Sequence, residues 1–155
     1  MRMMVAATLL ALCLPASAMA CATPSGASTL ESGMIQWINQ QRQANGLNPL
    51  KPSSKLKSAA QGHACDMATR GYFSHQRAGG PDLSGRVKSN GYRFRRVAEN
   101  IAKSRAADVG SAANIWRKSP PHWSNILKTG VSEIGLGVAT DGGSTYWVMN
   151  IGLQR

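Results

Sequence analysis

The chain has 155 residues, 43% of them hydrophobic, which is enough for one domain with its own hydrophobic core. Its formal net charge is +11, so we expect it to meet anionic material. After residue 20 no apolar run is long enough to cross a bilayer, which excludes a transmembrane span from that part of the sequence.

The first twenty residues have the organisation of a secretory signal peptide. Arg2 supplies a positive start, residues 3–14 are apolar, and small residues precede position 21 at the spacing that signal peptidase reads. We therefore expect a signal peptide over 1–20, a short linker over 21–28 and one folded domain over 29–155. The mature protein is expected to be secreted or periplasmic, where a basic protein meets polysaccharide or lipid head groups rather than nucleic acid.

Three cysteines are present, and Cys13 leaves with the signal peptide. In an oxidising compartment Cys21 and Cys65 can form a disulfide. Cleavage after Ala20 would instead make Cys21 the first mature residue, as in a bacterial lipoprotein, although Ala18 stands where such signals carry leucine. In a third interpretation Cys65 is a half-buried residue of a helix and Cys21 lies on a loose tail. The sequence leaves these alternatives open.

The first expected helix covers residues 28–45. Ser28 and Glu31 have the spacing of a capping box at its start. Prolines then favour an extended connector over 47–52, because each one disfavours the helical conformation in the residue before it. A second helix is expected from residue 53 or 54 to 70, since apolar residues recur there at helical spacing and a glycine follows.

Two aspartates mark the starts of later helices. Asp82 can cap a short helix over 83–89, and Asp108 can cap a helix that runs through Trp116. Between them, residues 92–97 alternate only weakly and fit either a short strand or an extended loop.

The C-terminal part of the chain reads as β structure. After a helical turn at 122–127, residues 133–139 and 145–151 have strand patterns and are separated by the turn signal Asp-Gly-Gly at 141–143. Helices come first and a hairpin comes last. This order predicts an α+β fold, with helices packed on an antiparallel sheet.

Three groups of motifs follow one another along the mature chain. They are HACDMA at 63–68 with YFSH at 72–75; GY at 91–92 with AENIA at 98–102; and Trp116 with SPPH at 119–122, NIL at 125–127 and EIGLGVA at 133–139. This ordered set resembles the bacterial branch of the CAP superfamily, which comprises cysteine-rich secretory proteins, antigen 5 and pathogenesis-related 1 proteins and is built on the SCP domain. The resemblance covers nearly all of the mature chain.

The resemblance implies an α-β-α sandwich, in which a three-stranded antiparallel sheet lies between helical layers. It also implies a cavity holding His75, Glu99 and His122, which stand at the matching motif positions. Glu133 belongs to the bacterial pattern and can line the same cleft. Many members place a second carboxylate after the tryptophan of their fourth helix, but residues 117–119 are Arg-Lys-Ser here. The family's four-residue site is therefore incomplete in this chain.

Several chemistries are open to these side chains. Two imidazoles with carboxylates suit Zn²⁺ or another divalent cation, and His75 and His122 are the candidate metal ligands. A histidine paired with Glu99 can act as general acid and base. The same groups can also form a hydrogen-bonded network that only satisfies its own polar atoms. No nucleophile is evident, so we assign no catalytic residue, and we expect His63 to be a packed core histidine.

The sharpest basic feature comprises Arg93, Arg95 and Arg96, interleaved with Tyr92 and Phe94. It can be a rim that steers an acidic ligand towards the cleft. The alternative, which we favour, is a solvated surface whose aromatic side chains face inward.

Three functions remain. Members of the superfamily are associated with sterols, other lipids and polysaccharides, so the leading hypothesis is a monomeric exported module that binds a lipid-like or anionic ligand of the envelope or extracellular medium. The second is a protease-like hydrolase, which needs a nucleophile or an activated water. The third is an extracellular interaction protein whose cleft has no function.

Overall fold

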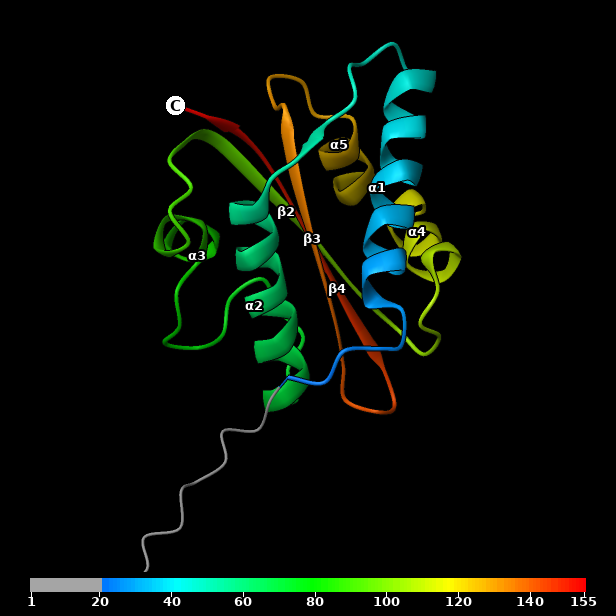
Figure 1. Cartoon of the computed structure of the whole chain (residues 1–155), viewed down its shortest axis with the longest axis vertical. Coiled ribbons are helices and arrows are strands. Elements are labelled where there is room, and N and C mark those ends of the chain that lie inside the picture. Colours follow the sequence, from blue (N-terminus) through cyan, green and yellow to red (C-terminus); the bar gives the residue numbers. More distant parts are fainter. Residues whose placement is uncertain (1–20) are drawn as a thin grey trace, which may run out of the picture.

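The computed structural model describes residues 21–155, so the signal peptide expected over 1–20 lies outside the described residues. Helices cover both faces of one sheet (Figure 1), which confirms the predicted α+β class and α-β-α layering. In chain order the elements are α1 (Ala27–Ala44), β1 (Lys51–Pro52), α2 (Ser54–Arg70), α3 (Leu83–Ser89), β2 (Phe94–Ser104), α4 (Val109–Arg117), α5 (Pro120–Ile126), β3 (Glu133–Thr140) and β4 (Thr145–Gln154).

The sheet has the strand order β1-β3-β4-β2. The three long strands pair antiparallel, as expected, and β1 is an addition that runs parallel to β3. It forms because the backbone on either side of Pro52 is extended: Lys51 N donates to the carbonyl of Ser132 at 2.9 Å, and Ser53 N donates to that of Ile134 at 2.8 Å. Pro52 has no N–H to donate, so this edge pairing stays short.

The face of the sheet covered by α1, α4 and α5 holds the larger hydrophobic core. Ile38, Trp116 and Ile126, one from each of these helices, are completely buried against the strands. Side chains alternate along a strand, so Ala98 of β2 points into this core. Its neighbour Glu99 therefore points to the opposite face, where α2 and α3 lie.

On that opposite face α2 packs directly on β3. Gly135 and Gly137 make this possible, because a Cβ atom at either position would overlap the backbone of α2 at Lys57 or Gln61. The Gln61 amide completes the contact: its Oε1 accepts from Val138 N at 3.0 Å and its Nε2 donates to Val138 O at 2.9 Å. The glycines of β3 thus serve close helix–strand approach, which is one recognised use of glycine within a strand.

Two of the three expected helix caps are present. Asp82 accepts from Gly85 N at 2.7 Å and Asp108 accepts from Ser111 N at 2.8 Å. The capping box expected at the start of α1 is wrong. That helix begins after Gly26 without a side-chain cap, because buried Glu31 pairs with Lys57 of α2 at 2.5 Å instead.

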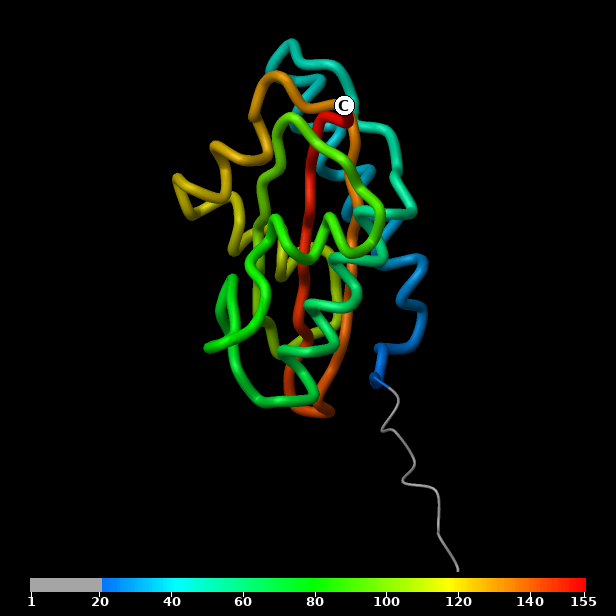
Figure 2. The backbone as a smooth tube through the Cα atoms, turned by 90° about the vertical axis from the view of Figure 1, so that its left-hand side faces the viewer, coloured from blue at the N-terminus to red at the C-terminus, as the bar shows by residue number. Residues whose placement is uncertain are grey.

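Of the two alternatives for residues 92–97, the strand is present from Phe94 onwards, and Tyr92 and Arg93 precede it. β2 begins at Phe94 and continues to Ser104, so it includes the AENIA motif and pairs along its length with β4. Its register shifts between Phe94 and Arg96, which leaves Arg95 as an extra residue in a β-bulge. β2 is an edge strand, with the loop 71–82 and α5 both lying beside it (Figure 2).

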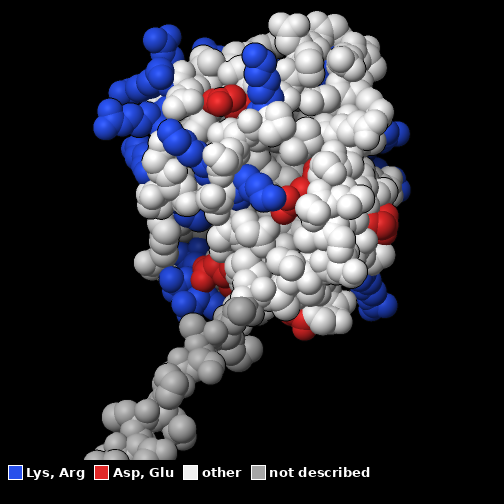
Figure 3. Space-filling model, in the orientation of Figure 1, with Lys and Arg blue, Asp and Glu red and all other residues white. Residues whose placement is uncertain are grey.

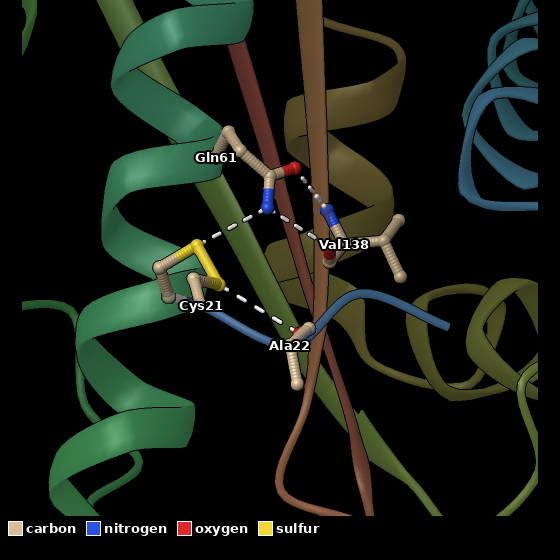
Figure 4. Close-up of a disulfide and its surroundings, with 5 residues drawn as sticks. Cys21, Ala22, Gln61 and Val138 are labelled. Carbon is tan, nitrogen blue, oxygen red and sulfur yellow. Dashed lines mark hydrogen bonds between the residues drawn. A yellow bond between two sulfur atoms is a disulfide. The ribbon is translucent and has the colours of Figure 1, made fainter. Parts of the chain in front are cut away.

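The N-terminal segment is fastened to the domain. Cys21 and Cys65 form a disulfide (Figure 4). The carbonyl of Ala22 accepts from Thr140 N at 2.9 Å. Of the alternatives for these cysteines, this structure therefore contains the disulfide. Within residues 21–155 no helix combines the length and the apolar character that a bilayer-spanning segment needs.

Candidate functional site

The expected site is built around the buried carboxylate of Glu99. Its side chain is 2% exposed, whereas that of His75, its partner from the 71–82 loop, is 56% exposed. His75 Nδ1 lies 3.0 Å from Glu99 Oε1. A carboxylate only accepts hydrogen bonds, so Nδ1 carries the proton and donates it, and the Nε2 lone pair remains free. Glu99 thus fixes both the tautomer and the orientation of an imidazole that faces solvent.

The second carboxylate oxygen of Glu99 forms an ion pair with Arg86 of α3. Arg86 Nη2 donates to Oε2 at 2.7 Å, and Arg86 Nη1 donates to the carbonyls of His75 at 2.9 Å and Pro81 at 3.1 Å. With its side-chain amide oriented to satisfy its neighbours, Asn150 also donates to Oε2 at 3.1 Å. Arg86 therefore neutralises the buried charge and also pins the loop that carries His75.

His63 is the buried histidine that the sequence predicted, and it lies against the site. It is 2% exposed, its Nε2 donates to the carbonyl of Ser74 at 3.0 Å, and the same nitrogen lies 4.0 Å from Glu99 Oε1. Burial lowers the pKa of His63 below its ordinary value, although Glu99 acts in the other direction. We infer that this neutral histidine positions the residue before His75.

Asp66 holds the start of the same loop. Its carboxylate accepts from Tyr72 Oη and from Arg70 Nε, both at 2.6 Å, and from Arg77 Nε at 3.3 Å. Burial alone would raise the pKa of Asp66, but the hydrogen bonds from Tyr72 and Arg70 outweigh it and the pKa is lowered. Burial and Asp66 together raise the pKa of Tyr72 to about 12. The loop is therefore anchored at both of its ends.

His122 reaches the same edge from the other layer of the sandwich. Asn100 of β2 donates to the His122 carbonyl at 2.9 Å, and Asn125 donates to Asn100 Oδ1 at 2.9 Å. Burial is the main cause that lowers the pKa of His122, and electrostatic repulsion from His75 in its protonated form acts in the same direction. Its Nδ1 is buried and has no hydrogen-bond partner among residues 21–155.

An open cleft of about 510 Å³ lies where these elements meet. It runs along both sides of β2, with His75 and Glu99 on one side and Asn125 of α5 on the other. Leu83 and Val97 supply apolar walls, and Asp82 adds a carboxylate. Pockets of this kind, apolar with a few fixed polar groups, are common binding sites.

Glu133 is not brought to this cleft. It stands at the start of β3, and its Oε2 accepts from Tyr92 Oη at 2.7 Å. The tyrosine ring lies over Gly152 of β4, where a Cβ atom would meet Oη at 2.7 Å. Burial, then the hydrogen bond to Glu133, raises the pKa of Tyr92. In this structure Glu133 is therefore part of a packing contact two strands away from Glu99.

The comparisons with known proteins agree with this fold. A family model described as CAP, the cysteine-rich secretory protein family, matches residues 35–151. The chain belongs to the CAP family. It is 31% identical over 119 residues to the uncharacterized protein YkwD of Bacillus subtilis (strain 168), across 77% of this chain and 46% of YkwD. This CAP chain thus spans about half the length of that relative.

Two solved structures extend the comparison. An extracellular SCP-domain protein of Bacillus anthracis has a TM-score of 0.69 and 28% identity, and the match covers 85% of this chain and 44% of that one. An outer surface protein of Borrelia burgdorferi has a TM-score of 0.78 over 88% of this chain and 100% of that one, but at 18% identity it shows the fold alone. The Bacillus relatives place the chain in the bacterial branch, as its motifs predicted.

The metal-binding capacity of this CAP site is limited. Among residues 21–155 no group of three or more His, Cys, Asp or Glu side chains is arranged to hold a metal ion. Glu99 is not available as a ligand, because His75, Arg86 and Asn150 occupy its oxygens. Two imidazoles remain, and an outward-facing histidine held from behind by a carboxylate is a common arrangement for a metal ligand. His75 lines the cleft, whereas His122 is not among the residues that line it.

Sequence reasoning overlooked Arg86 and the three asparagines of the site. Arg86 lies between Leu83 and Val87 on the inward side of a short helix, and a charged residue at such a position indicates a buried partner. That signal was present in the sequence. Asn100, Asn125 and Asn150 had no comparable signal, since their roles depend on which strands become neighbours.

Proposed function

We propose that this chain is an exported ligand-binding protein. Its cleft beside β2 takes a lipid-like or anionic molecule of the envelope or extracellular medium, and His75 and His122 hold a divalent metal ion, such as Zn²⁺, whose open positions face that ligand. Export rests on the expected signal peptide and agrees with the extracellular description of the Bacillus anthracis relative.

The observation that carries this proposal is the orientation of His75 by the buried carboxylate of Glu99. Its carboxylate is buried and its two oxygens accept from His75, Arg86 and Asn150. A general base needs a free oxygen within reach of the proton that it removes. The network instead commits Glu99 to orienting His75, so the group presented to the open cleft is the Nε2 atom of that imidazole, which can bind a metal ion or a ligand.

The bound metal would supply a positive charge for an anionic group of the ligand. His75 would contribute Nε2, since its Nδ1 donates to Glu99. The lowered pKa of His122 keeps its imidazole neutral, which is the form that binds metal. The cleft walls Leu83 and Val97 would contact the apolar part of the ligand.

Zinc titration by calorimetry tests the proposal on the metal-stripped protein over residues 21–155. We expect one zinc ion per chain in the wild type and no binding by the variant His75→Ala/His122→Ala. The control Ser74→Ala/Ser124→Ala changes residues next to these histidines and should bind like the wild type. Equal binding by the histidine variant, or no binding by the wild type, would reject the metal site and leave the histidines a structural role.

A further inference from the structure

A second depression, of about 550 Å³, lies where β2 begins. We call it the cationic cradle. It has three positively charged residues, Arg95, Arg96 and Lys128, and its remaining lining comprises Phe94, Val97 and Thr129. Figure 3 shows Lys and Arg side chains gathered at this end of the molecule, near the point where β4 ends. Nothing in the proposed metal site uses these residues.

The β-bulge explains why two consecutive arginines line one depression. In a regular strand Arg95 and Arg96 would point to opposite faces of the sheet. The register shift between Phe94 and Arg96 leaves Arg95 opposite no residue of β4. A bulge of this kind redirects side chains locally, and here both arginines are exposed and line the same hollow.

The opposite wall of the cradle is fixed in place. Arg42 of α1 is buried, and its Nη1 donates to the carbonyls of Ile126 and Lys128, both at 2.9 Å. Gly130 follows with a φ of +69°, and a Cβ atom there would lie 2.7 Å from Arg96 Nη1. The Arg96 guanidinium therefore rests over a glycine, which leaves room for it beside Lys128.

In the part of the chain that the structure describes, the cations of the cradle form no ion pair. Within residues 21–155, Arg95, Arg96 and Lys128 have no carboxylate oxygen within 4.0 Å, whereas Arg70, Arg77 and Arg86 each have one. Three converging positive groups without partners raise the local concentration of anions. Such a cluster costs stability through repulsion unless an anion neutralises it, so its arrangement points to a ligand.

We infer that the cationic cradle binds phosphate groups of a flexible anionic chain. Guanidinium groups match phosphate oxygens in pairs, and a tetrahedral phosphate offers oxygens to several donors at once, whereas a carboxylate has only two. A soluble chain fits better than a membrane, because the surface is hollow. The large exposed apolar residues of the described chain, Phe73 and Ile115, lie outside it.

The cradle adjoins the cleft beside β2, since Val97 lines both. A chain held at the cradle can therefore extend along β2 towards His75. In this respect the inference deepens the proposed function, for which it names the ligand class. The two sites use different residues, so they can be tested separately.

Inorganic polyphosphate of about ten units is the probe, and binding is measured by calorimetry at several salt concentrations, without added metal. We expect Arg95→Ala/Arg96→Ala to bind at least tenfold more weakly than the wild type. Its salt dependence should also be shallower, by roughly one unit of the log–log slope for each lost contact. The control Arg105→Ala/Lys118→Ala removes the same charge from exposed positions elsewhere and should change affinity less than twofold.

A third variant, Gly130→Ala, alters the cradle without changing the charge. Its methyl group would displace the Arg96 guanidinium, so we expect a loss of affinity of threefold or more, with thermal melting to show that the variant is folded. Equal losses in both double variants would overturn the proposal, because they would indicate only general charge attraction. Equal affinity for polygalacturonate, a carboxylate chain, or binding to anionic lipid vesicles but not to polyphosphate, would also overturn it.

These outcomes are independent of the zinc experiment. Failure of zinc binding with intact polyphosphate binding would reject the metal site and keep the cradle. Zinc binding without polyphosphate binding would keep the metal site and reject the cradle as a phosphate site.

Discussion

The inner strand β3 and the edge strand β2 differ in how they are held. Under α2, the strand β3 presents glycines, and helix and strand approach at backbone distance with no ion pair at the contact between Gly137 and Gln61. The edge strand β2, in contrast, carries a network of charged and amide side chains that includes Glu99, Arg86 and Asn100. The first region has one way to pack, whereas the second consists of directional contacts around an open cleft.

The difference teaches where this fold can vary. Close backbone packing leaves no space for a side chain, so β3 and α2 tolerate little change. The edge strand carries the hydrogen bonds that orient histidines, and its contacts can be exchanged one at a time. Stability should therefore be most sensitive under α2, and ligand binding most sensitive at β2.

The largest expected effect is at Gly137. A valine there would overlap the backbone of α2, and we expect Gly137→Val to abolish the cooperative thermal transition seen by circular dichroism. Gly62, on the open side of the same helix contact, has no atom near its Cβ position, so Gly62→Val should change the free energy of unfolding by less than about 0.5 kcal/mol. Similar losses in both variants would contradict the proposed close packing.

The next effect is at Arg86. Arg86→Met leaves Glu99 buried without its cation, and we expect a loss of about 3–5 kcal/mol in the free energy of unfolding, measured with urea. The double variant Arg86→Met/Glu99→Gln removes both charges and should recover more than half of that loss. No recovery would mean that Arg86 matters through its contacts with the 71–82 loop, and not through Glu99.

Local patterns predicted most of the helices and the final hairpin. Asp82 and Asp108 cap the helices expected of them, and the Asp-Gly-Gly turn joins β3 to β4. The errors are tertiary in origin. Glu31 fits a capping box by spacing, but its pairing with Lys57 on another helix prevails. The full length of β2 was not evident because residues 98–102 are all buried, so they lack the alternation of buried and exposed residues that marks a half-exposed strand.

The site was predictable only in part. The resemblance brought His75 and Glu99 to notice, and their side chains are in contact. Spacing alone could not do so, since 24 residues separate them. The partners of Glu99 come from α3 and β4, and no local pattern connects Arg86 or Asn150 to it. Such contacts depend on strand order, which is a property of the whole fold.

The smallest expected effect is that of pH on the free energy of unfolding. Burial lowers the pKa of both His63 and His122 below the unfolded value near 6.5, so the unfolded chain binds more protons than the folded one as pH falls through that value. Stability should therefore be complete above about pH 7 and should decline towards about pH 5.5. Urea unfolding at the two pH values measures the decline, and His63→Gln should reduce it. An unchanged decline in that variant would assign the effect elsewhere.

The disulfide and the cationic cradle lie at opposite ends of the molecule. Ala22, next to Cys21, is bonded to Thr140 at the end of β3, whereas Lys128 and the cradle lie before its start. Eight residues of strand separate the two by roughly 25 Å. One sulfur atom cannot carry both a disulfide and a thioether lipid, so oxidation of Cys21 removes that sulfur as an anchoring point. If another group attached the protein to a surface at its disulfide end, Arg95 and Arg96 of the cationic cradle would lie at the opposite end and face away from that surface.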